Sequence, residues 1–555
     1  MPRRIVVVGG VAAGAGAAAK ARREDENAEI LVFEKGPHVS FANCGLPYFV
    51  GGEIEARESL LVQTPEALRA RFRLDVRVLH EVTRIDTQRR EVEVVDLRTG
   101  RSFVQPYDAL VLAMGARGVV PELPGVHAPN VRLLRTVEDA VALRAMVEKG
   151  ARRAVVVGAG FIGLEAAENL RRQGLEVTLV EKMGQVLPPL DSELTTELLE
   201  ALVELGVRTH LGTGVQRFVT EGETAVAAEL DDGTRIDADL FVLSIGVRPN
   251  VELATRAGIA LGPSRAIAVD ERMETNVPGV FAAGDVAELR QLASGREAWM
   301  ALAGPANKAG RVAGANAAGR DMRFRGALGT AIVRVGRKVA GKTGLGQKDC
   351  ARLGIACRVT YTTSAHHASY YPGARNLTIA LVTKRESGRL LGAQVVGEEG
   401  VDKRLDVFAT ALHAGMHVAD LEELDLAYAP PFGAAKDPVI MAAMTHANAW
   451  RGEVPTLTPR EAAPLSAQSQ VVDVRSAAEH ARGAVANAIL LPLPELRDRV
   501  GELDPAQRTI VYCQGGQRSA FAVRALRQLG FRDVWSVTGG WRMIERCRAA
   551  DAPPR

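Results

Sequence analysis

The 555-residue sequence has few aromatic residues, few cysteines, no long apolar run and a net charge close to zero. Aromatic residues make up 5% of the chain, so its apolar content comes mostly from small and aliphatic side chains. Five cysteines at irregular spacing exclude a disulfide framework and a zinc-type metal site, and they favour a reducing, cytoplasmic compartment. A net charge of +3 without a dominant basic stripe argues against a nucleic-acid-binding protein.

The length of the chain excludes a single hydrophobic core, so about three to five domain-sized units are expected. The first apolar run, residues 5–8, follows two arginines but stops at Gly9 and Gly10. It is too short for a signal peptide or a membrane span, so we predict no membrane association. We interpret the run as a buried strand.

Residues 5–34 carry a strand, a glycine-rich turn, a helix and a second strand that ends in an acid. Backbone N–H groups at such a helix start bind a pyrophosphate, and the acid binds a ribose hydroxyl. Val11 stands where the second glycine of the dinucleotide fingerprint is expected. The cofactor-binding residues predicted from this unit are Gly9, Gly10, Ala13, Gly14, Glu34 and Lys35.

A complete three-glycine fingerprint follows the apolar run 154–157, and the next strand ends at Glu181. A carboxylate there repels a 2′-phosphate and favours NADH, although Lys182 beside it leaves NADPH open. The predicted residues are Gly158, Gly160, Ile162, Gly163 and Glu181. Two such sites suggest two dinucleotides, a tightly bound flavin and an exchanging nicotinamide.

A single cysteine, Cys44, lies shortly after the first site in the stretch Ser-Phe-Ala-Asn-Cys-Gly-Leu-Pro-Tyr, residues 40–48. Gly45 and Pro47 favour a turn and a helix start, so we expect backbone N–H groups and the helix dipole to stabilise a Cys44 thiolate. No second cysteine lies within several residues. Its redox partner must therefore be a bound small thiol, the oxygen chemistry of a sulfenic acid, or another domain.

Later motifs resemble those of the pyridine nucleotide-disulfide reductase superfamily over roughly residues 1–450. Residues 275–285 resemble its second FAD motif, whose aspartate holds the ribityl chain of the flavin. Residues 113–116 and 244–250 resemble its two chain crossovers between FAD and NAD domains. The resemblance implies FAD and NADH as cofactors and adds Gly115, Gly246 and Asp285 to the cofactor-binding residues.

The stretch around Cys44 resembles the active site of the coenzyme A-disulfide reductase branch, in which one cysteine cycles through a mixed disulfide with coenzyme A. Segments 366–374 and 427–438 resemble the parts of its dimerisation domain that reach the partner subunit's site. This resemblance implies a homodimer with a shared active site, in which Tyr370 and Tyr428 donate hydrogen bonds or protons to the leaving thiolate. Tyr371 remains open as the alternative to Tyr370.

Coenzyme A carries phosphates, so cations are expected near the reactive cysteine. A solvated helix face is the alternative interpretation of the basic residues. The candidate coenzyme A-binding residues, two of them polar neighbours of the thiol, are Lys20, Arg23, Ser40, Asn43, Arg71, Arg73 and Lys436.

Cys513 follows an apolar strand and precedes a short glycine-rich loop that ends at Arg518 and a helix. Such a loop surrounds a sulfur with backbone N–H groups, lowers its pKa and stabilises a persulfide, and Arg518 adds positive charge. With Asp473 near the start and Trp541 near the end, the segment resembles a single rhodanese domain. Ala484 stands where that family usually has a histidine.

The other cysteines show no such context. Cys350 and Cys357 lie seven residues apart without a neighbouring His or Cys cluster, so we interpret them as structural and predict no metal site. Cys547 on the last helix is interpreted as incidental.

The predicted fold class is α/β, with two Rossmann-like dinucleotide-binding domains, an α+β dimerisation domain and a C-terminal α/β rhodanese domain. The predicted segments are 1–115 and 246–322 for FAD, 116–245 for NAD, 323–450 for dimerisation, 451–468 for a linker and 469–555 for rhodanese.

The predicted function is NADH-dependent reduction of persulfides, polysulfides or coenzyme A disulfide at Cys44, with coenzyme A as thiol partner and Cys513 as persulfide carrier. Two alternatives stay open. One is an NADH oxidase or peroxidase that uses a cysteine sulfenate. The other is a sulfurtransferase that consumes no NADH.

Overall fold

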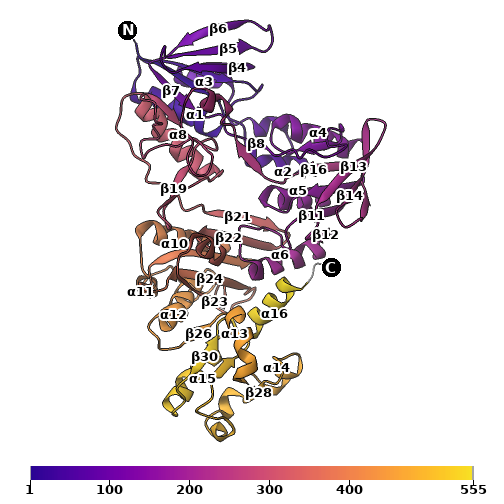
Figure 1. The fold of residues 1–555 in the computed structure, drawn as a ribbon, viewed down its shortest axis with the longest axis vertical. Coiled ribbons are helices and arrows are strands. Elements are labelled where there is room, and N and C mark those ends of the chain that lie inside the picture. The colour runs from indigo at the N-terminus through magenta and orange to yellow at the C-terminus, as the bar shows by residue number, and fades with distance from the viewer. Residues whose placement is uncertain (1, 553–555) are drawn as a thin grey trace. The chain divides into compact units, whose positions relative to one another are not determined.

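A computed structural model describes residues 2–552, and this part of the chain divides into two compact units. The first unit extends to Lys182 and resumes from Leu205 to Gly329. The second unit comprises Met183–Glu204 and the chain from Thr330 onward. Figure 1 traces the elements of both units.

A five-stranded parallel sheet forms the first dinucleotide-binding domain, in the order β18–β7–β1–β2–β3. Its β-branched and aliphatic residues are buried on both faces, as expected for parallel strands covered by helices. Because β1 and β2 pair in parallel, the turn after β1 and the end of β2 lie at the same edge. The strands are β1 (Arg4–Val8), β2 (Glu29–Glu34), β3 (Asp75–Val78), β7 (Ala109–Leu112) and β18 (Val280–Ala282).

Small residues let two helices of this domain pack with their backbones close together. These helices are α1 (Ala12–Glu24) and α8 (Ala303–Ala317). A Cβ atom on Gly310 or Gly314 would overlap backbone atoms of Ala13 or Ala17, respectively. The close approach fixes the start of α1 beside the glycine-rich turn without large aromatic side chains.

A second parallel sheet, in the order β12–β11–β10–β16–β9, forms the nicotinamide-type domain. Its strands are β9 (Val131–Leu133), β10 (Arg153–Val157), β11 (Glu176–Glu181), β12 (Arg208–Leu211) and β16 (Leu240–Leu243). The two crossovers expected between the domains pair as antiparallel strands β8 (Ala116–Gly118) and β17 (Val247–Pro249). The two predicted Rossmann-like domains are thus confirmed.

Shorter elements complete the first unit. The remaining strands are β4 (His80–Asp86), β5 (Glu91–Asp96), β6 (Ser102–Pro106), β13 (Val215–Glu221), β14 (Thr224–Leu230), β15 (Arg235–Asp237), β19 (Leu289–Gln291) and β20 (Arg296–Ala298). The remaining helices are η1 (Asn43–Gly45), α2 (Leu46–Val50), η2 (Arg57–Leu60), α3 (Pro65–Phe72), α4 (Val137–Glu148), α5 (Phe161–Arg172) and α7 (Glu252–Arg256).

The second unit begins with an antiparallel sheet in the order β21–β22–β25–β24–β23. The strands are β21 (Ala331–Val335), β22 (Lys338–Gly344), β23 (Cys357–Ala365), β24 (Asn376–Lys384) and β25 (Leu390–Gly397). The helices of this region are α6 (Ser192–Glu204), α9 (Gln347–Leu353), α10 (Val401–Ala414), α11 (Val418–Glu422) and α12 (Pro438–Trp450). The mixture of antiparallel strands and helices agrees with the predicted α+β domain.

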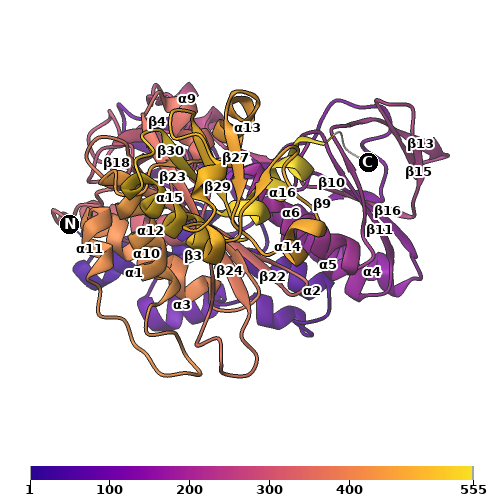
Figure 2. The same cartoon turned by 90° about the horizontal axis from the view of Figure 1, so that it is seen from below.

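The C-terminal domain contains a third parallel sheet, in the order β26–β30–β29–β27–β28 (Figure 2). Its strands are β26 (Thr456–Leu457), β27 (Gln470–Asp473), β28 (Ile489–Leu490), β29 (Thr509–Tyr512) and β30 (Val534–Val537). The helices are α13 (Pro459–Leu465), η3 (Ser466–Gln468), α14 (Ala477–Ala481), η4 (Leu493–Glu495), η5 (Val500–Glu502), α15 (Gln517–Gln528) and α16 (Gly540–Asp551).

The segment 451–468, expected as a linker, is instead ordered into β26, α13 and η3. Thr458 caps α13, and Glu461 completes a capping box, which is the physical reason for a helix in a proline-rich stretch. β26 pairs in parallel with β30, so the segment is part of the C-terminal sheet.

The antiparallel and C-terminal domains of the second unit contact each other directly. The backbone N–H of Tyr361 donates to Thr538 Oγ1 at 2.8 Å, and that hydroxyl donates to the Tyr361 carbonyl at 3.1 Å. The Tyr361 hydroxyl donates to Glu193 on α6. These bonds are buried, so they fix the end of β30 against β23.

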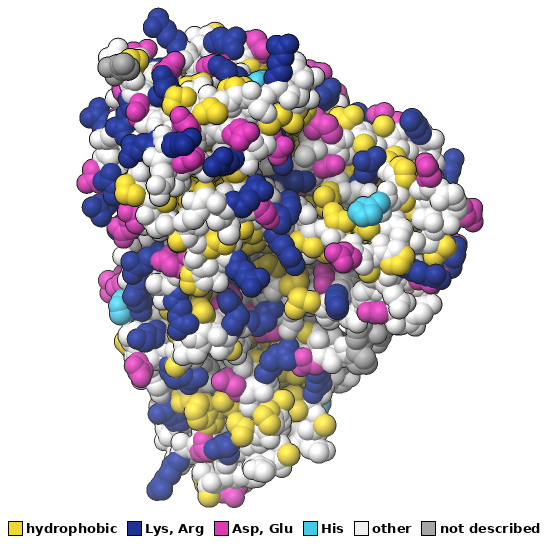
Figure 3. Space-filling model, turned by 45° about the horizontal axis from the view of Figure 1, so that its top comes forward, with side chains coloured by type: hydrophobic (Ala, Val, Ile, Leu, Met, Phe, Trp, Pro, Cys, Tyr) yellow, Lys and Arg dark blue, Asp and Glu magenta, His cyan; other side chains and the backbone are white. Residues whose placement is uncertain are grey.

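The face drawn in Figure 3 carries Lys and Arg side chains interspersed with Asp and Glu side chains. Among residues 2–552, no helix combines the length and the apolar character that a bilayer crossing requires. In the same described part of the chain, no group of three or more His, Cys, Asp or Glu side chains is arranged to hold a metal ion.

Candidate active site

The first glycine-rich turn is placed as the sequence predicts. Gly9 has a left-handed φ of 96°, and a Cβ atom on Gly14 would overlap the Gly9 carbonyl, so both positions require glycine. Val11 has a negative φ of −94°, so this position does not need the left-handed conformation that favours glycine. It precedes α1 and provides no side-chain cap, which suits a helix start that binds phosphate.

Glu34 lies at the end of β2 beside this turn. One carboxylate oxygen accepts from the Gly10 N–H at 2.8 Å, and the other accepts from the Gly36 N–H at 2.7 Å. The carboxylate is therefore fixed at the position from which a ribose would be bound. Lys35 follows and is exposed, and Ala13 is buried in the first turn of α1.

The second turn repeats this arrangement with all three glycines. Gly158 has a φ of 100°, Gly160 precedes α5 without a side-chain cap, and a Cβ on Gly163 would overlap the Gly158 carbonyl. Glu181 ends β11, is almost fully buried and accepts from the Ala159 N–H at 2.7 Å. Ile162 lies beside Gly163 in the first turn of α5.

Tertiary packing places the second FAD motif, residues 275–285, beside the glycine-rich turn at Gly9. A Cβ on Gly284, whose φ is 81°, would lie 2.8 Å from the Ala13 Cβ, so Asp285 is next to the start of α1. Asp285 pairs with Arg135 at 3.2 Å. The crossover residues Gly115 and Gly246 both have positive φ, at 64° and 113°. The close approach at Gly284, which a side chain would block, fits the binding of FAD.

Cys44 lies in η1, immediately before α2, and its side chain is exposed. Partial burial raises the pKa of the Cys44 thiol, the Glu165 and Asp285 carboxylates raise it further, and Arg135 opposes them. The structure thus corrects the expectation of a thiolate stabilised by a helix start. The helix α2 has only five residues, so its dipole is too small to overcome these effects.

Glu165 is a site residue that the sequence analysis missed. It lies in α5, two residues after Gly163, and burial raises its pKa to about 7. The Tyr48 hydroxyl donates to Glu165 Oε1 at 3.4 Å. The sequence shows an acid in the first turns of the helix after the second glycine motif. Only the fold shows that this turn faces Cys44.

The predicted phosphate-binding residues lie around the ends of α1 and α3. Arg22 donates to the carbonyls of Phe72 and Arg73, at 2.9 and 3.2 Å, and so holds these two ends together. Arg23, Arg71 and Arg73 are exposed.

Three further candidates are less exposed. Lys20 is nearly buried and pairs with Glu24, so it presents little charge to a ligand. Ser40 and Asn43 flank the Cys44 loop, and the buried Oδ1 of Asn43 has no hydrogen-bond partner among the described residues.

Tyr370 and Tyr428 are 58 residues apart, yet their hydroxyl groups lie 3.2 Å from each other. Their side chains are 75% and 49% exposed, so this pair is available to another molecule. Tyr371 instead packs its ring against His367, which favours Tyr370 as the acting residue. Lys436 lies on the same segment as Tyr428 and is exposed.

A buried arginine joins the two tyrosine segments. Arg404 donates to the His366 carbonyl at 2.5 Å and to Asp437 Oδ2 at 2.7 Å, and both side chains of this ion pair are at most 3% exposed. Neither residue was singled out from the sequence, because a charged side chain on a helix usually faces solvent.

Cys513 immediately follows β29, and backbone groups of its loop lie around it. The Gly516 N–H donates to Cys513 Sγ at 3.1 Å, and the Cys513 carbonyl accepts from the Trp541 N–H at 2.7 Å. Arg518 forms a bidentate ion pair with Glu479, at 2.6 and 2.7 Å, that holds it at the loop. This pair lowers the pKa of Glu479 to about 2, and Glu479 was not predicted from the sequence.

The segment in which the expected histidine is missing is held by other bonds. Arg475 donates to Asp473 Oδ2 at 2.7 Å and to the Gly483 carbonyl at 2.6 Å. The Tyr512 hydroxyl donates to Asp473 at 2.8 Å and accepts from the Val485 N–H at 3.1 Å. The C-terminal domain is therefore fully formed around Ala484.

Three family models match the chain. One described as a pyridine nucleotide-disulphide oxidoreductase matches residues 3–310, its dimerisation domain matches residues 331–438, and a rhodanese-like domain matches residues 458–547.

Individual proteins resemble most or all of the chain. The chain is 36% identical over 444 residues to the NAD(P)H coenzyme A polysulfide/persulfide reductase of Pyrococcus horikoshii. The match covers 80% of this chain and 98% of that protein. The crystal structure of reduced CoADR-RHD from Bacillus anthracis is 39% identical, with a TM-score of 0.95 and 98% of each chain covered. The NAD-dependent persulfide reductase from A. fulgidus is 37% identical, with a TM-score of 0.90, and 97% of this chain and 99% of that chain are covered.

Proposed function

Because the chain belongs to the pyridine nucleotide-disulphide oxidoreductase family and ends in a rhodanese-like domain, we propose that it reduces persulfides, polysulfides or coenzyme A disulfide with NAD(P)H. It is an NAD(P)H-dependent flavoprotein reductase, and its resemblance to a coenzyme A polysulfide/persulfide reductase supports this substrate class. The observation that carries the proposal is Cys44, an exposed thiol that is the only cysteine of residues 1–329.

The proposed reaction at Cys44 is thiol–disulfide exchange with coenzyme A persulfide. The Cys44 thiolate bonds to the inner sulfur of the persulfide, and the bond to the outer sulfur breaks and releases HS⁻. Two electrons and one proton then return the mixed disulfide to a Cys44 thiolate and a coenzyme A thiol. FAD held at the Gly9 turn, Glu34 and Asp285 would supply these electrons from NAD(P)H, and Glu181 favours NADH over NADPH.

Substrate binding is assigned to polar neighbours of Cys44 and to cationic side chains. Ser40 and Asn43 orient the pantetheine arm beside the thiol, while Lys436 and the cations at the ends of α1 and α3 bind phosphates. Those cations are Lys20, Arg23, Arg71 and Arg73. Arg23, Arg71 and Arg73 are exposed, which supports the assignment, whereas Lys20 contributes least because it is paired with Glu24.

The assembly is proposed to be a homodimer whose active site is shared between subunits. The match to the dimerisation domain and the exposed pair Tyr370 and Tyr428 support it. These phenols donate protons or hydrogen bonds to the thiolate that leaves Cys44 of the other subunit. Cys513 carries or delivers persulfide sulfur, and Arg518 supplies positive charge to its loop. The cysteine usage continues to favour a cytoplasmic enzyme.

Matched cysteine variants test the assignment. Cys44→Ser should abolish NADH consumption with coenzyme A persulfide, because Cys44 is the only cysteine of residues 1–329, which carry both dinucleotide sites. Cys513→Ser should spare the reduction of coenzyme A disulfide. Cys547→Ser is the control, since this thiol is buried and burial raises its pKa to about 12. Full persulfide reduction by Cys44→Ser, with normal FAD content, would contradict the proposal.

An NADH oxidase is the second candidate, because an exposed single thiol can also form a sulfenic acid. A sulfurtransferase that does not use NADH is the third. Oxygen uptake and sulfide release, measured together with NADH consumption, separate the three. A reductase couples NADH consumption to sulfide release, and an oxidase couples NADH consumption to oxygen uptake. A sulfurtransferase releases sulfide without consuming NADH.

A further inference from the structure

A cavity of about 220 Å³ lies in the second unit between α9, the start of β23 and the segment that leads into α13. Six of its lining residues are Gln347, Cys357, Arg358, Arg385, Thr458 and Glu461. It contains none of the residues assigned to the reductase or the rhodanese site. Its volume accommodates a molecule of only a few non-hydrogen atoms.

Two cysteines meet at this cavity. Cys357 lines the cavity and is half-buried, while Cys350 is fully buried behind it. The two thiols are hydrogen-bonded to each other, across the tight turn that Gly354 makes at the end of α9. Sequence spacing alone had suggested two independent structural thiols. In the fold, the thiol of Cys357, which lines the cavity, lies next to the buried thiol of Cys350.

The two thiols differ in acidity. The hydrogen bond from Cys350 and the positive charge of Arg385 lower the pKa of Cys357 against the effect of burial. The same hydrogen bond, together with burial, raises the pKa of Cys350. Asp191 opposes ionisation of both thiols, but it lies behind α9 and is engaged there. The accessible sulfur is thus the nucleophile, and the concealed one keeps its proton.

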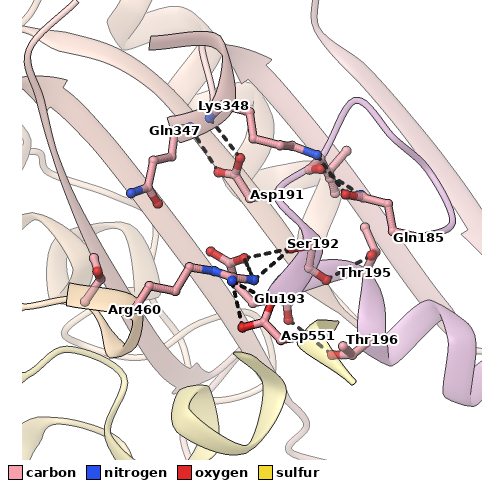
Figure 4. Close-up of polar contacts among 12 residues, drawn as sticks. Gln185, Asp191, Ser192, Glu193, Thr195, Thr196, Gln347, Lys348, Arg460 and Asp551 are labelled. Carbon is pink, nitrogen blue, oxygen red and sulfur yellow. Dashed lines mark hydrogen bonds and ion pairs between the residues drawn. The ribbon is translucent and has the colours of Figure 1, made fainter. Parts of the chain in front are cut away.

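Polar contacts anchor the two helices that border the cavity. Asp191 accepts from the N–H groups of Gln347 and Lys348, at 3.1 and 3.2 Å, and so caps α9 (Figure 4). Arg460 of α13 pairs with Glu193 at 3.6 Å and with Asp551 at 2.6 Å. These contacts hold α9 and α13 on either side of the opening, so the thiols stay in place.

The charges around the opening suit an anion. Arg358 has a buried Nε with no hydrogen-bond partner among the described residues. Arg385 is exposed at the rim. Glu461, the acid in the lining, is committed to the α13 cap, because its Oε2 accepts from the Thr458 N–H at 2.8 Å and from the Thr458 hydroxyl at 2.9 Å.

We propose that Cys350 and Cys357 form a second sulfur-reducing site, independent of the flavin, that takes small anionic persulfides or polysulfides. A soft thiolate next to the guanidinium groups of Arg358 and Arg385 selects a small, negatively charged sulfur compound, and the second thiol makes a two-electron reaction possible. A lone buried cysteine would neither bind such an anion nor complete a two-electron reaction. Two cysteines are too few to hold a structural zinc ion, for which four ligands are usual.

The reaction has two balanced steps. First, the Cys357 thiolate attacks the outer sulfur of R–S–SH, the S–S bond of the substrate breaks, and R–S⁻ leaves. Second, Cys350 gives its proton to the leaving thiolate and attacks Cys357 Sγ, so that an internal disulfide forms and HS⁻ leaves. The dithiol loses two electrons, and the outer sulfur of the substrate gains them. An excess of a small thiol restores the dithiol.

The experiment uses the full-length, FAD-loaded protein carrying Cys44→Ser and Cys513→Ser, without NADH, and treats it with sodium tetrasulfide. Iodoacetamide then traps free thiols, and tryptic peptides are analysed by mass spectrometry. Cleavage after Lys348, Arg352 and Arg358 places Cys350 and Cys357 on separate peptides. We expect these peptides to become joined by a disulfide, with release of sulfide, and a small thiol to separate them again.

Three added variants show the order of steps. Cys350→Ser should stop the reaction at a Cys357 peptide that carries one extra sulfur atom, whereas Cys357→Ser should leave the Cys350 peptide unmodified. Arg385→Gln should slow the modification of Cys357 several-fold. FAD content and the thermal unfolding curve verify that each variant is folded.

Two results would overturn the proposal. One is that both peptides remain fully alkylated after tetrasulfide treatment. The other is that hydrogen peroxide joins them as fast as tetrasulfide does, which would indicate a general oxidant sensor. Because NADH is absent and Cys44 is replaced, neither result bears on the proposed reductase activity.

Discussion

At the scale of single residues, burial and the charges beside Cys44 set the acidity of its thiol. Glu165 is half-buried near the thiol, and burial raises the pKa of this carboxyl to about 7. Below that pH the carboxyl is neutral, and above it the negative charge opposes ionisation of Cys44. A Cys44 thiol ionises in the alkaline range, so Glu165 is charged wherever the thiol titrates.

Replacing this carboxylate should therefore make Cys44 more acidic. We expect Glu165→Gln to lower the apparent pKa of Cys44, because a nearby like charge that opposes ionisation is removed. The measurement is the pH dependence of Cys44 alkylation by iodoacetamide, followed by mass spectrometry of its peptide. Glu176→Gln, which removes an exposed carboxylate of the same unit, should not change the profile. An unchanged profile in Glu165→Gln would show that the two groups do not interact.

At the scale of elements, the starts of α1 and α5 carry the dinucleotide sites because glycine lets the helix approach the preceding strand. In α1, a Cβ at Gly14 would overlap the backbone of Gly9. A Cβ at Gly16, one half-turn further, would meet only the side chain of Asn307 at 4.0 Å. A side chain is therefore excluded at Gly14 but fits at Gly16.

This contrast gives a paired prediction for FAD binding. Gly14→Ala should abolish FAD retention through purification, since the turn at Gly9 must open to admit the methyl group. Gly16→Ala should keep FAD and add roughly 0.5–1 kcal/mol to the free energy of unfolding, because alanine favours a helix. Flavin absorbance per chain and urea denaturation measure the two effects. Equal FAD loss in both variants would refute the role assigned to Gly14.

The two tyrosine segments depend on one ion pair. Arg404→Met should lower the free energy of unfolding by about 3–5 kcal/mol, because Asp437 is left buried without its partner. Turnover with persulfide should fall as Tyr370 and Tyr428 separate, while reduction of bound FAD by NADH should persist. Asp406→Asn, an exposed charge of the same helix, serves as the control. Loss of flavin reduction together with turnover would indicate general unfolding instead.

At the scale of the whole molecule, the proposal places Cys44 and the tyrosine pair of one active site on different subunits. Two variants that are each inactive should then complement one another. Mixed dimers of Cys44→Ser with a Tyr370→Phe, Tyr428→Phe chain contain one intact site, so random mixing should restore about a quarter of wild-type activity. Steady-state NADH consumption after co-expression measures it. No recovery, despite demonstrated mixed dimers, would mean that each site is built from one chain.

The sequence by itself determined the order of domains and the positions of the reactive groups. Gly158 to Gly163 with Glu181, and the Cys513 loop with Arg518, are local signals, because turn conformation and strand ends depend on neighbouring residues. The same holds for the single cysteine within residues 40–48. A proline-rich composition misled the interpretation of 451–468, since one capping box at Thr458 was enough to order it.

Only the tertiary structure decided which side chains meet. Glu165 faces Cys44 from a helix 121 residues away in sequence and helps to raise the pKa that the local pattern had predicted to fall. Arg404 with Asp437, Tyr370 with Tyr428, and Cys357 with the arginines of its cavity are likewise products of packing. The physical reason is that burial and through-space charge depend on neighbours in three dimensions, which local periodicity and turn chemistry do not specify.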